Sequence, residues 1–272
     1  MFDTHVHSCY SYDSKATIED ICQSAIERNI SGVTITDHAN LNTFHSRNLL
    51  KRFKEMIQDF ESCKKKYSGQ LKLYCGIEIG EFLREPDKAE ILLSLTDYDE
   101  IIGSIHYLNY FDQDITFAAA AFDERVSDQQ IYHLLEVYFD DLLKTAQMFD
   151  FDIFAHLTYP LRYVSFKYGR NIDISCFYCK ICEIYKVLIE RGISLEVNTS
   201  RFRERYHYLL TPELPLLDLY LSLGGKRITL GSDAHIPENL GMGFMNVVGI
   251  LKDIGFDSYY FYEQRMPKKV NF

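Results

Sequence analysis

The hydrophobic and polar positions of this chain repeat with two different periods. Short runs rich in Val, Ile and Leu predict β-strands, and the longer segments between them carry apolar residues at helical spacing. In the first such segment Thr17 is a good helix N-cap, and Ile18, Ile21 and Ala25 then recur on one helix face. This alternation of strand and helix is predicted seven times along the chain.

The two periods divide most of the chain between strands and helices. Strands are expected at residues 3–8, 33–38, 71–79, 100–108, 153–156, 193–198 and 227–230. Helices are expected at residues 14–28, 49–67, 87–95, 128–149, 174–191, 212–223 and 240–251. Residues 109–126 and 158–169 are predicted to be long loops, and the tail after Asp253 has room for one further short strand.

Alternating strands and helices imply a parallel sheet, which is either open or closed into a barrel. The strand ends favour the barrel, because six of the seven predicted strands end in His, Asp or Glu. A closed parallel barrel brings all C-terminal strand ends to one face, whereas an open sheet keeps its first, fourth and seventh strands apart. We therefore predict an α/β barrel of seven parallel strands, formed by a single domain over residues 1–272.

Composition narrows the class of protein. Hydrophobic residues make up 47% of the 272 residues and the formal net charge is −10. A nucleic-acid or membrane-surface protein would need basic patches, so neither partner is expected. No signal peptide opens the chain, and no apolar run approaches the roughly 18 residues that span a bilayer. The seven cysteines, an odd number, fit reduced thiols, and we expect a cytoplasmic protein.

Two short motifs carry the candidate chemistry. His5 and His7 lie two residues apart on a strand, as do Asp233 and His235, so each pair faces one way. The full set of candidate metal ligands is His5, His7, Asp13, His38, Glu78, His106, His156, Asp233 and His235. One such histidine alone could be an ordinary core residue. Six of the chain's nine histidines at equivalent strand ends favour a shared metal site.

The number of candidate ligands exceeds what one ion accepts, since zinc is usually four-coordinate. Two or three ions are therefore predicted. Glu78 has Gly76 and Gly80 on its own strand face, which leaves room around a carboxylate that could bridge two ions. Clustered cations generate hydroxide from bound water near neutral pH and bind an anionic substrate.

The same residues resemble the PHP (polymerase and histidinol phosphatase) family, and in particular its histidinol-phosphatase branch. The matching runs are Asp3-Thr4-His5-Val6-His7-Ser8, Thr36-Asp37-His38, Gly76-Ile77-Glu78, His106, Ala155-His156, Glu196-Val197-Asn198-Thr199-Ser200 and Gly231-Ser232-Asp233-Ala234-His235. The resemblance covers nearly the whole chain. It implies a distorted seven-stranded barrel that holds three divalent ions, commonly zinc, manganese or iron.

The resemblance also implies how the ligands are shared. His5, His7, Glu78 and Asp233 would hold one ion. Glu78, His106 and His156 would hold a second ion, and Asp13, His38 and His235 would hold the third.

The expected reaction is attack by a metal-bridging hydroxide on the phosphorus of a phosphate monoester, with L-histidinol phosphate as the first-choice substrate. Glu78, Asp233 and His235 are the candidate catalytic residues, with Asp233 or a nearby histidine as a proton donor to the leaving alkoxide.

Four further residues are candidates for binding the substrate. Arg162 and Arg203 could hold phosphate oxygens, because guanidinium groups suit phosphate. Arg201 is an extra positive charge where the family often has Gly-Leu-Arg, and Glu81 could receive a substrate ammonium. For each arginine the alternative is an ordinary surface residue, and for Glu81 it is a solvated strand end.

Three other functions stay open at this point. A related PHP phosphoesterase would act on a nucleotide, a phosphodiester or phosphotyrosine. An amidohydrolase also begins with His-x-His, but it usually carries a carboxylated lysine where this chain has Glu78. A non-catalytic metal-binding barrel would typically have lost ligands. The sequence leaves the native metal, the exact substrate and the oligomeric state open.

A separate run, Cys176-x-x-Cys179-x-x-Cys182, could suggest a metal cluster. The iron–sulfur pattern of bacterial ferredoxins needs a further Cys followed by Pro, which this chain lacks. We therefore predict that the three thiols lie on a helix face buried against the barrel.

Overall fold

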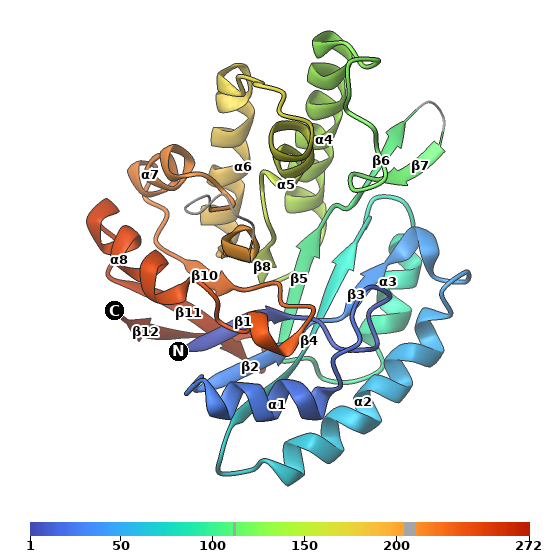
Figure 1. Cartoon of the computed structure of the whole chain (residues 1–272), viewed down its shortest axis with the longest axis vertical. Helices are drawn as coiled ribbons and strands as arrows, with labels where there is room; N and C mark the ends of the chain where they lie inside the picture. Colours follow the sequence, from blue (N-terminus) through green and yellow to red (C-terminus); the bar gives the residue numbers. More distant parts are fainter. Residues whose placement is uncertain (111–112, 204–209) are drawn as a thin grey trace.

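The computed structural model describes residues 1–110, 113–203 and 210–272, and in that part of the chain ten strands form one sheet. Nine of them run parallel to their neighbours, and seven of these form the predicted series, in sequence order around the molecule (Figure 1). They are β1 (Phe2–Val6), β2 (Gly32–Ile35), β4 (Lys72–Gly80), β5 (Glu100–Ser104), β8 (Ile153–Phe154), β9 (Ser194–Asn198) and β10 (Ile228–Gly231). The predicted α/β fold with seven parallel strands is confirmed.

The first and last strands of this series, β1 and β10, lie side by side without a regular ladder of backbone hydrogen bonds. Val6 and Ala234 form an isolated parallel bridge, in which the His7 N–H donates to Ala234 O at 2.9 Å. The Thr4 hydroxyl donates to Leu230 O at 3.1 Å. Side chains and one bridge therefore join the two edges, which is how the distorted barrel departs from a regular one.

The carboxylate of Asp3 reinforces this seam. Its two oxygens accept hydrogen bonds from the backbone N–H groups of Ser232 and Gly241, each at 2.9 Å. Complete burial raises the pKa of Asp3 to about 6 even though these N–H donors act in the opposite direction. Asp3, two residues before His5, thus links β1 to the segment after β10 through hydrogen bonds.

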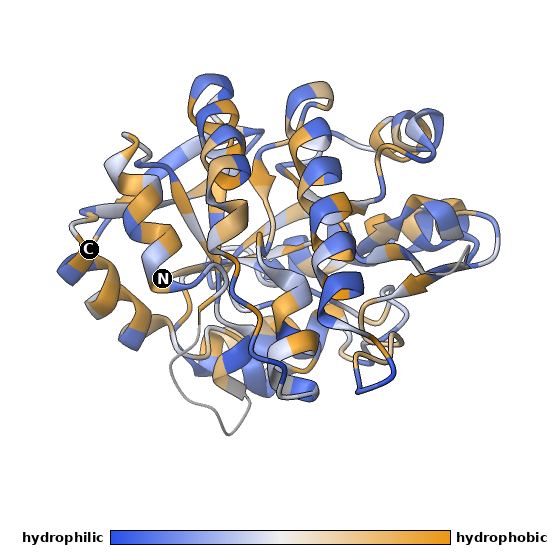
Figure 2. Ribbon diagram, turned by 90° about the horizontal axis from the view of Figure 1, so that it is seen from above, coloured by the Kyte–Doolittle hydropathy of each residue, from blue (hydrophilic) through white to orange (hydrophobic). Residues whose placement is uncertain are grey.

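In the part of the chain that the structure describes, seven longer helices surround the strands (Figure 1). They are α1 (Ile18–Glu27), α2 (Leu49–Lys66), α3 (Pro86–Leu93), α4 (Asp128–Met148), α6 (Tyr178–Arg191), α7 (Leu214–Ser222) and α8 (Phe244–Ile254). Hydrophobic and hydrophilic residues alternate along each helix in Figure 2, as expected for helices with one face on the core. Thr17 caps α1 as predicted, in a reciprocal capping box with Asp20.

Two predicted strands are divided in the structure. The second ends at Ile35, and a short strand β3 (His38–Asn40) then pairs with the C-terminal half of β4. The fourth ends at Ser104, and the chain continues into an antiparallel hairpin of β6 (Tyr107–Tyr110) and β7 (Gln113–Thr116). The prediction of a loop over residues 109–126 was therefore wrong in part, because cross-strand pairing there depends on a partner that helical or strand periodicity does not reveal.

The loop predicted at residues 158–169 contains helical turns. They are α5 (Tyr159–Leu161) and a short wide helix η2 (Arg162–Lys167). Four short 3₁₀ turns complete the helical inventory of the described chain: η1 (Leu41–Thr43), η3 (Ser175–Phe177), η4 (Ser200–Arg203) and η5 (Pro237–Asn239). No helix in residues 1–110, 113–203 or 210–272 combines the length and apolarity needed to cross a membrane.

The C-terminal tail forms a hairpin of β11 (Ser258–Glu263) and β12 (Met266–Asn271). It lies across the N-terminal ends of the barrel strands. Phe261 stacks on Phe2 at the start of β1 with ring centroids 3.8 Å apart, and the Tyr262 hydroxyl is 2.8 Å from Ser194 Oγ at the start of β9. The hairpin thus covers the end of the barrel opposite to the C-terminal strand ends.

The prediction for the three cysteines was wrong. Cys176 and Cys179 are exposed and Cys182 is half-buried. Helix α6 instead buries Ile181, Ile184, Tyr185 and Leu188, so the inward face of the helix is rotated away from the thiols. Bulkier apolar side chains on the same helix decide which face packs on the core.

Candidate metal centre

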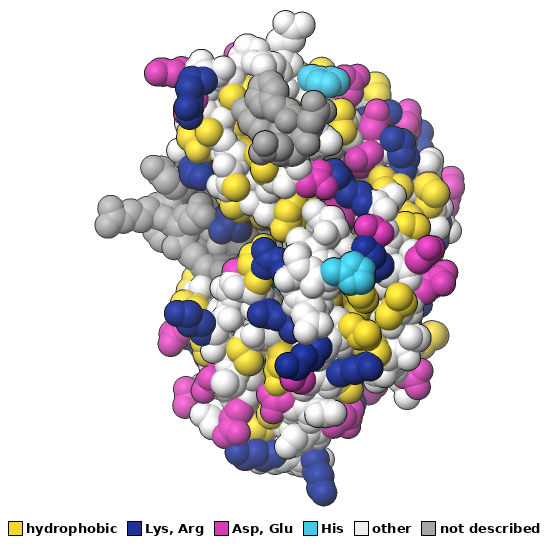
Figure 3. All heavy atoms as spheres, turned by 90° about the vertical axis from the view of Figure 1, so that its right-hand side faces the viewer, with side chains coloured by type: hydrophobic (Ala, Val, Ile, Leu, Met, Phe, Trp, Pro, Cys, Tyr) yellow, Lys and Arg dark blue, Asp and Glu magenta, His cyan; other side chains and the backbone are white. Residues whose placement is uncertain are grey.

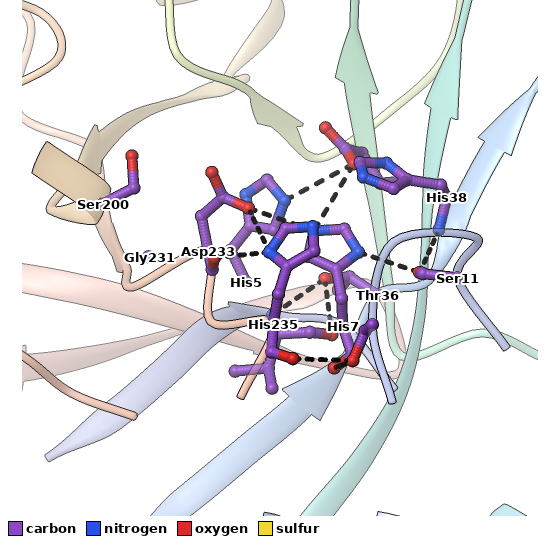
Figure 4. A network of polar contacts seen from close by, with 12 residues as sticks. His5, His7, Ser11, Thr36, His38, Ser200, Gly231, Asp233 and His235 are labelled. Atoms are coloured by element: carbon purple, nitrogen blue, oxygen red, sulfur yellow. Dashed lines mark hydrogen bonds and ion pairs between the residues drawn. The ribbon is translucent and has the colours of Figure 1, made fainter. Parts of the chain in front are cut away.

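All nine candidate ligands lie together at the C-terminal ends of the barrel strands. They come from strands β1, β3 and β4 and from the loops after β1, β5, β8 and β10, segments far apart in the sequence. Figure 4 shows His5, His7, His38, Asp233 and His235 converging from different strands. These ligands lie close together because the C-terminal ends of all strands in a parallel barrel are on the same face.

Glu78 is the centre of the cluster and is fully buried. Its Oε1 lies 3.2 Å from His106 Nε2 and 3.1 Å from His156 Nε2. The two imidazole nitrogens are themselves 3.2 Å apart. One carboxylate oxygen and two ring nitrogens therefore point at one small volume.

The other oxygen of Glu78, Oε2, faces a different group of histidines. It lies 3.5 Å from His5 Nε2, 3.7 Å from His7 Nε2 and 2.6 Å from His38 Nδ1. The two oxygens of one carboxylate thus serve two clusters of imidazoles, which is the arrangement of a bridging ligand.

A third group of ligand atoms lies further out. Asp13 Oδ2 is 3.6 Å from His38 Nε2 and 3.4 Å from His235 Nε2. Asp233 Oδ1 lies between the inner and outer groups, 3.3 Å from His7 Nε2 and 3.4 Å from His235 Nδ1. Asp13 is 36% exposed and His235 22%, so this group borders solvent.

Several of the converging atoms are buried and make no hydrogen bond of normal geometry, although a group of opposite charge lies within 4 Å of each. They are His5 Nε2, His7 Nε2, His38 Nδ1 and Glu78 Oε2. Unpaired buried polar atoms are costly, and they are rare in folded proteins. Imidazole nitrogens and carboxylate oxygens at these separations fit divalent zinc, manganese or iron. Three overlapping groups have ligand atoms close enough to share an ion: His7, His38 and His235; His5, His7 and Asp233; and His38, Glu78 and His106.

Four histidines are held at Nδ1, which leaves Nε2 available to an ion. The pairs are His5 with Glu196 Oε1 (2.6 Å), His7 with Ser11 Oγ (3.1 Å), His106 with Asn40 Oδ1 (3.1 Å) and His235 with the backbone oxygen of Asp233 (2.9 Å). Ring orientation is therefore fixed by neighbours outside the ligand set.

The sequence did not assign a role to Glu196, Ser11 or Asn40. Glu196 contacts two of the ligands, because its Oε1 lies 2.6 Å from His5 Nδ1 and its Oε2 accepts the His156 N–H at 2.7 Å. The available signal was its position two residues before Asn198, on the same face of a strand whose end was identified. For Ser11 and Asn40 the sequence carried no signal beyond their proximity to His7 and His38.

Charge in the cluster is strongly redistributed. Burial alone would lower the pKa of His38, but the carboxylates of Glu78 and Asp13 raise it to about 10. Burial is likewise overcome at His5, where Glu196 and Glu78 raise the pKa well above its ordinary value. At Glu78 burial opposes ionisation, yet the surrounding histidines hold its pKa well below the usual range. The centre therefore keeps its carboxylates ionised and ready to bind cations.

A cavity of about 230 Å³ opens directly onto the outer ligands. The described residues that line it are Tyr12, Asp13, His38, His106, Tyr159, Arg162, Tyr163, Asp233 and His235. Aromatic rings and one guanidinium group thus surround a floor made of metal-ligand types. Such a cavity can accept a small molecule with an anionic group and a planar apolar part.

A sequence model of the PHP domain matches residues 3–200, which is most of the chain. The chain belongs to the PHP domain family. The probable histidinol-phosphatase of Clostridium acetobutylicum is 28% identical over 98% of this PHP chain and 99% of its own length. The histidinol-phosphatase of Lactococcus lactis subsp. lactis is 25% identical over 93% of this chain and 91% of its own.

Solved structures show the same fold. The crystal structure of the histidinol phosphate phosphatase of Lactococcus lactis subsp. lactis, complexed with zinc, L-histidinol and phosphate, matches this PHP chain with a TM-score of 0.81. Its sequence is 24% identical and the match covers 98% of both chains. The similarity therefore extends over the whole barrel and its surrounding helices.

The PHP barrel distributes the four predicted substrate residues differently. Arg162 lines the cavity. Arg201 is buried, and its Nη1 lies 3.6 Å from Glu213 Oε1, away from the described cavity wall. The side chain of Arg203 lies outside the described residues. Arg201 is therefore not a surface residue, and its part in substrate binding stays a prediction.

Glu81 is also buried and is absent from the described lining of the cavity. Its Oε1 accepts hydrogen bonds from the N–H groups of His106 and Tyr107, at 2.7 and 3.0 Å. Its backbone has φ +63°, an unusual value for a non-glycine residue. The geometry thus gives Glu81 the task of fixing the backbone at His106, in place of the solvated strand end expected as the simpler alternative.

Proposed function

We propose that this PHP chain is a metal-dependent phosphomonoesterase that hydrolyses L-histidinol phosphate to L-histidinol and phosphate. The observation that carries the proposal is Glu78, whose two buried oxygens each face separate imidazole clusters below a cavity that contains Arg162. The curated relatives that match over more than nine-tenths of this chain carry the name histidinol-phosphatase. The combination of ligand set, cavity and relatives supports this substrate.

We propose three ion positions. His5, His7, Glu78 and Asp233 would hold the first ion. Glu78, His106 and His156 would hold the second, and Asp13, His38 and His235 the third. The distances between these atoms support the sharing of Glu78 between the first two ions and the more exposed position of the third. Zinc fits the nitrogen-rich set, and manganese or iron would also accept it.

Divalent ions at these positions would lower the pKa of a bound water and neutralise charge that develops on the phosphoryl group. The chain's own residues supply the rest. Arg162, which lines the cavity, is proposed to bind a phosphate oxygen, because its guanidinium group can donate two parallel hydrogen bonds. Arg203 is proposed from the sequence alone as a second such group.

Proton transfer is assigned to Asp233 with His235. Burial raises the pKa of Asp233, but contact with His7 and His235 more than reverses this and holds the carboxyl ionised. An ionised Asp233 on the cavity wall can accept a proton from the attacking water. Asp233 would then return that proton to the leaving alkoxide, while His235, whose Nδ1–H donates to the backbone oxygen of Asp233 and lies 3.4 Å from Asp233 Oδ1, helps to keep the carboxylate in place.

The organic part of the substrate would lie against the tyrosines. Tyr12, Tyr159 and Tyr163 line the cavity, and the hydroxyls of Tyr159 and Tyr163 are hydrogen bonded at 2.9 Å. Stacking on these rings suits a planar imidazole, which an unbranched alkyl phosphate lacks. This wall is where selectivity among phosphate esters would arise.

The test is phosphate release by zinc-loaded protein from L-histidinol phosphate, a generic aryl phosphate and several nucleotides. We expect kcat/KM for histidinol phosphate on the order of 10⁴ M⁻¹s⁻¹ or more, well above the others. Activity on the aryl phosphate alone would retain the chemistry and exclude this substrate. No turnover of any ester by protein with confirmed metal content would contradict the proposal.

A further inference from the structure

Tyr12 and Asp13 form the exposed tip of the loop between β1 and α1. The loop is anchored on both sides of this tip, because Ser11 and Ser14 are buried and both hydroxyls are hydrogen bonded. Tyr12 is 40% exposed and Asp13 36%. A candidate metal ligand, Asp13, thus lies at the exposed tip of a loop that is anchored on both sides of it.

The ring of Tyr12 makes two contacts that restrain this tip. It lies nearly parallel to the imidazole of His38, with centroids 5.3 Å apart and an interplanar angle of 26°. The guanidinium carbon of Arg47 lies 3.6 Å from the centroid of the same ring. Tyr12 lines the cavity, whereas Arg47 is not among the described residues that do so. Arg47 therefore supports the ring from beyond the cavity wall.

Arg47 is itself held in a rigid segment. Its backbone N–H donates to Thr43 O at 2.9 Å, and Phe44 and Leu49 on either side are buried. A neighbouring arginine, Arg52, reaches the same loop. Its Nη1 donates to the backbone oxygen of Tyr10 at 3.0 Å. The turn before α2, through Arg47, and the first turn of α2, through Arg52, thus contact the loop after β1 at two points.

The restrained residues belong to the outermost of the three proposed ion positions. His5 and His7 side chains are at most 1% exposed, whereas Asp13 and His235 border solvent. Buried ligands are fixed by dense packing, but an exposed carboxylate keeps more rotamer freedom and loses more entropy when it binds an ion. The outermost position therefore gains most from a support outside the ligand set.

We propose that Arg47 is a positioning residue for the outermost ion, and that it acts through the ring of Tyr12 on Asp13 and His38. The inference rests on the proposed function only in assuming an ion held by Asp13, His38 and His235. A guanidinium group over an aromatic ring contributes a modest attraction, strongest for partly desolvated pairs. Mutation of a residue that holds a metal ligand in place typically lowers metal affinity by 10- to 100-fold.

General electrostatics offers a competing account, because several Lys and Arg side chains lie on the side of the molecule that carries α2, α3 and the β6–β7 hairpin (Figure 3). Removing any of them would make the region more negative and would favour cation binding. Lys51 is a matched control. It lies on the first turn of α2, its side chain is 67% exposed, and it pairs with Glu55 at 3.7 Å. Lys51→Ala removes the same charge and leaves the Tyr12 ring supported.

The experiment is a zinc titration of the metal-free full chain in competition with a chromophoric chelator, which resolves the stepwise affinities without substrate. In the wild type we expect three ions. In Arg47→Met the weakest-bound ion should bind about tenfold more weakly, and the other two should be unchanged. Arg47→Lys should restore part of the loss, because an ammonium group also binds an aromatic face.

Tyr12 supplies an independent pair of variants on an exposed tip, where substitution does not disturb the core. Tyr12→Phe keeps the ring and should bind the third zinc as the wild type does. Tyr12→Leu removes the ring and should match Arg47→Met. Lys51→Ala should not weaken any of the three.

Unchanged affinity for the third ion in both Arg47→Met and Tyr12→Leu would overturn the inference. So would a loss in Lys51→Ala as large as that in Arg47→Met. A wild type that binds no zinc would contradict the proposed function itself. Three tightly bound zinc ions without turnover of histidinol phosphate would contradict only the substrate, so the two failures are distinguishable.

Discussion

The two nitrogens of each site histidine have different tasks in this molecule. In His5 and His106 a polar neighbour binds Nδ1, at 2.6 and 3.1 Å, and Nε2 points at the oxygens of Glu78. His38 is the exception, since its Nδ1 faces Glu78 and its Nε2 faces Asp13. His38 therefore lies between the inner and the outer ligands, where it can serve either.

Binding of metal should expel protons from the site. Neighbouring carboxylates raise the pKa of His5 well above its ordinary value and the pKa of His38 to about 10. Both rings therefore carry an extra proton at pH 7 in the metal-free protein. An ion needs the neutral ring, so zinc binding should release about two protons. Affinity should then rise with pH between 6 and 9, by about tenfold per pH unit for each proton displaced.

Calorimetry of zinc binding in buffers with different ionisation heats measures this release. The apparent enthalpy should vary linearly with the buffer's ionisation enthalpy, with a slope near two. A binding enthalpy that is independent of the buffer, or an affinity that falls as pH rises, would contradict the proposed charge state of the site.

Glu196→Gln tests the residue that holds two ligands at once. A Gln oxygen can still accept from His5, but the amide nitrogen then confronts the N–H of His156, which loses its acceptor. We expect metal affinity and kcat to fall by 10- to 100-fold. Glu190→Gln, an exposed position on α6, is the control and should behave as the wild type. Equal metal content and kcat in the two variants would show that Glu196 is dispensable.

At this scale the sequence predicts ligands better than it predicts their supports. His5, His7, Asp233 and His235 are recognisable because their spacing on a strand already places them on one face. Glu196 and Asn40 act only through neighbours brought in by the barrel, so no local pattern reveals them. Burial is likewise not readable from the sequence, since the Arg201 side chain is buried with its Nη1 3.6 Å from Glu213 Oε1.

Among the elements, β4 is the strand in which glycines are required on both sides of a candidate ligand. Gly76 and Gly80 lie two residues to either side of Glu78, on the same face. A Cβ at Gly76 would come within 2.7 Å of Thr34 Cγ2, so the space beside Glu78 is occupied by side chains of neighbouring strands. The glycines thus make room for the Thr34 and Asn40 side chains of neighbouring strands, and not for open space around the carboxylate.

Gly80→Ala should therefore damage the metal centre through a neighbour. The added Cβ would lie 2.6 Å from Asn40 Oδ1 and 3.4 Å from His106 Nδ1, so Asn40 must move away from the ring that it orients. We expect about a tenfold loss of affinity for the ion held by His106. Metal titration of the purified variant measures it.

Gly249→Ala is the matched control for that substitution. Nothing lies within 4 Å of a Cβ at this position on α8. Replacing a glycine inside a helix should raise the free energy of unfolding by up to about 1 kcal/mol and leave zinc binding unchanged. Wild-type zinc affinity in Gly80→Ala would mean that Asn40 does not orient His106.

The order of strands and helices could be predicted from the hydrophobic periodicity of the sequence, but the conformation of the loops around the site could not. The strands and helices of the barrel have long apolar patterns, whereas the β6–β7 hairpin and η2 are short and lack them. Their conformation is set by contacts with the barrel. One example is the Lys167 ammonium, which donates to Ala118 O at 2.9 Å between two loops.

At the scale of the whole molecule, the candidate ligands and the contacts of the C-terminal hairpin lie at opposite ends of the barrel. The proposed metal centre lies at the C-terminal strand ends, and the β11–β12 hairpin covers the opposite end. The turn of this hairpin, Gln264 and Arg265, has positive φ at both residues, the geometry of a tight hairpin turn. Gln264 N–H donates to Asp99 Oδ1 at 3.0 Å, so the turn is tied to the start of β5.

Arg265→Ala should accordingly lower stability without affecting the site. Arg265 Nε lies 3.1 and 3.3 Å from the two oxygens of Asp152, a nearly buried carboxylate that would lose its charged partner. We expect the free energy of unfolding to fall by about 1–2 kcal/mol, measured by chemical denaturation. Lys268→Ala, exposed on the same hairpin, is the control. A loss of bound metal in Arg265→Ala would show that the two ends are coupled.

The central claim is that the gathered histidines hold the ions that hydrolyse histidinol phosphate. The most direct test measures metal content and turnover on the same samples of wild type, His106→Ala and His133→Ala. His106 Nε2 lies 3.2 Å from Glu78, whereas His133 has a side chain 72% exposed on α4. The account predicts that His106→Ala loses one ion and at least 10²-fold in kcat/KM, while His133→Ala keeps both. Full metal content and full activity in His106→Ala would contradict it.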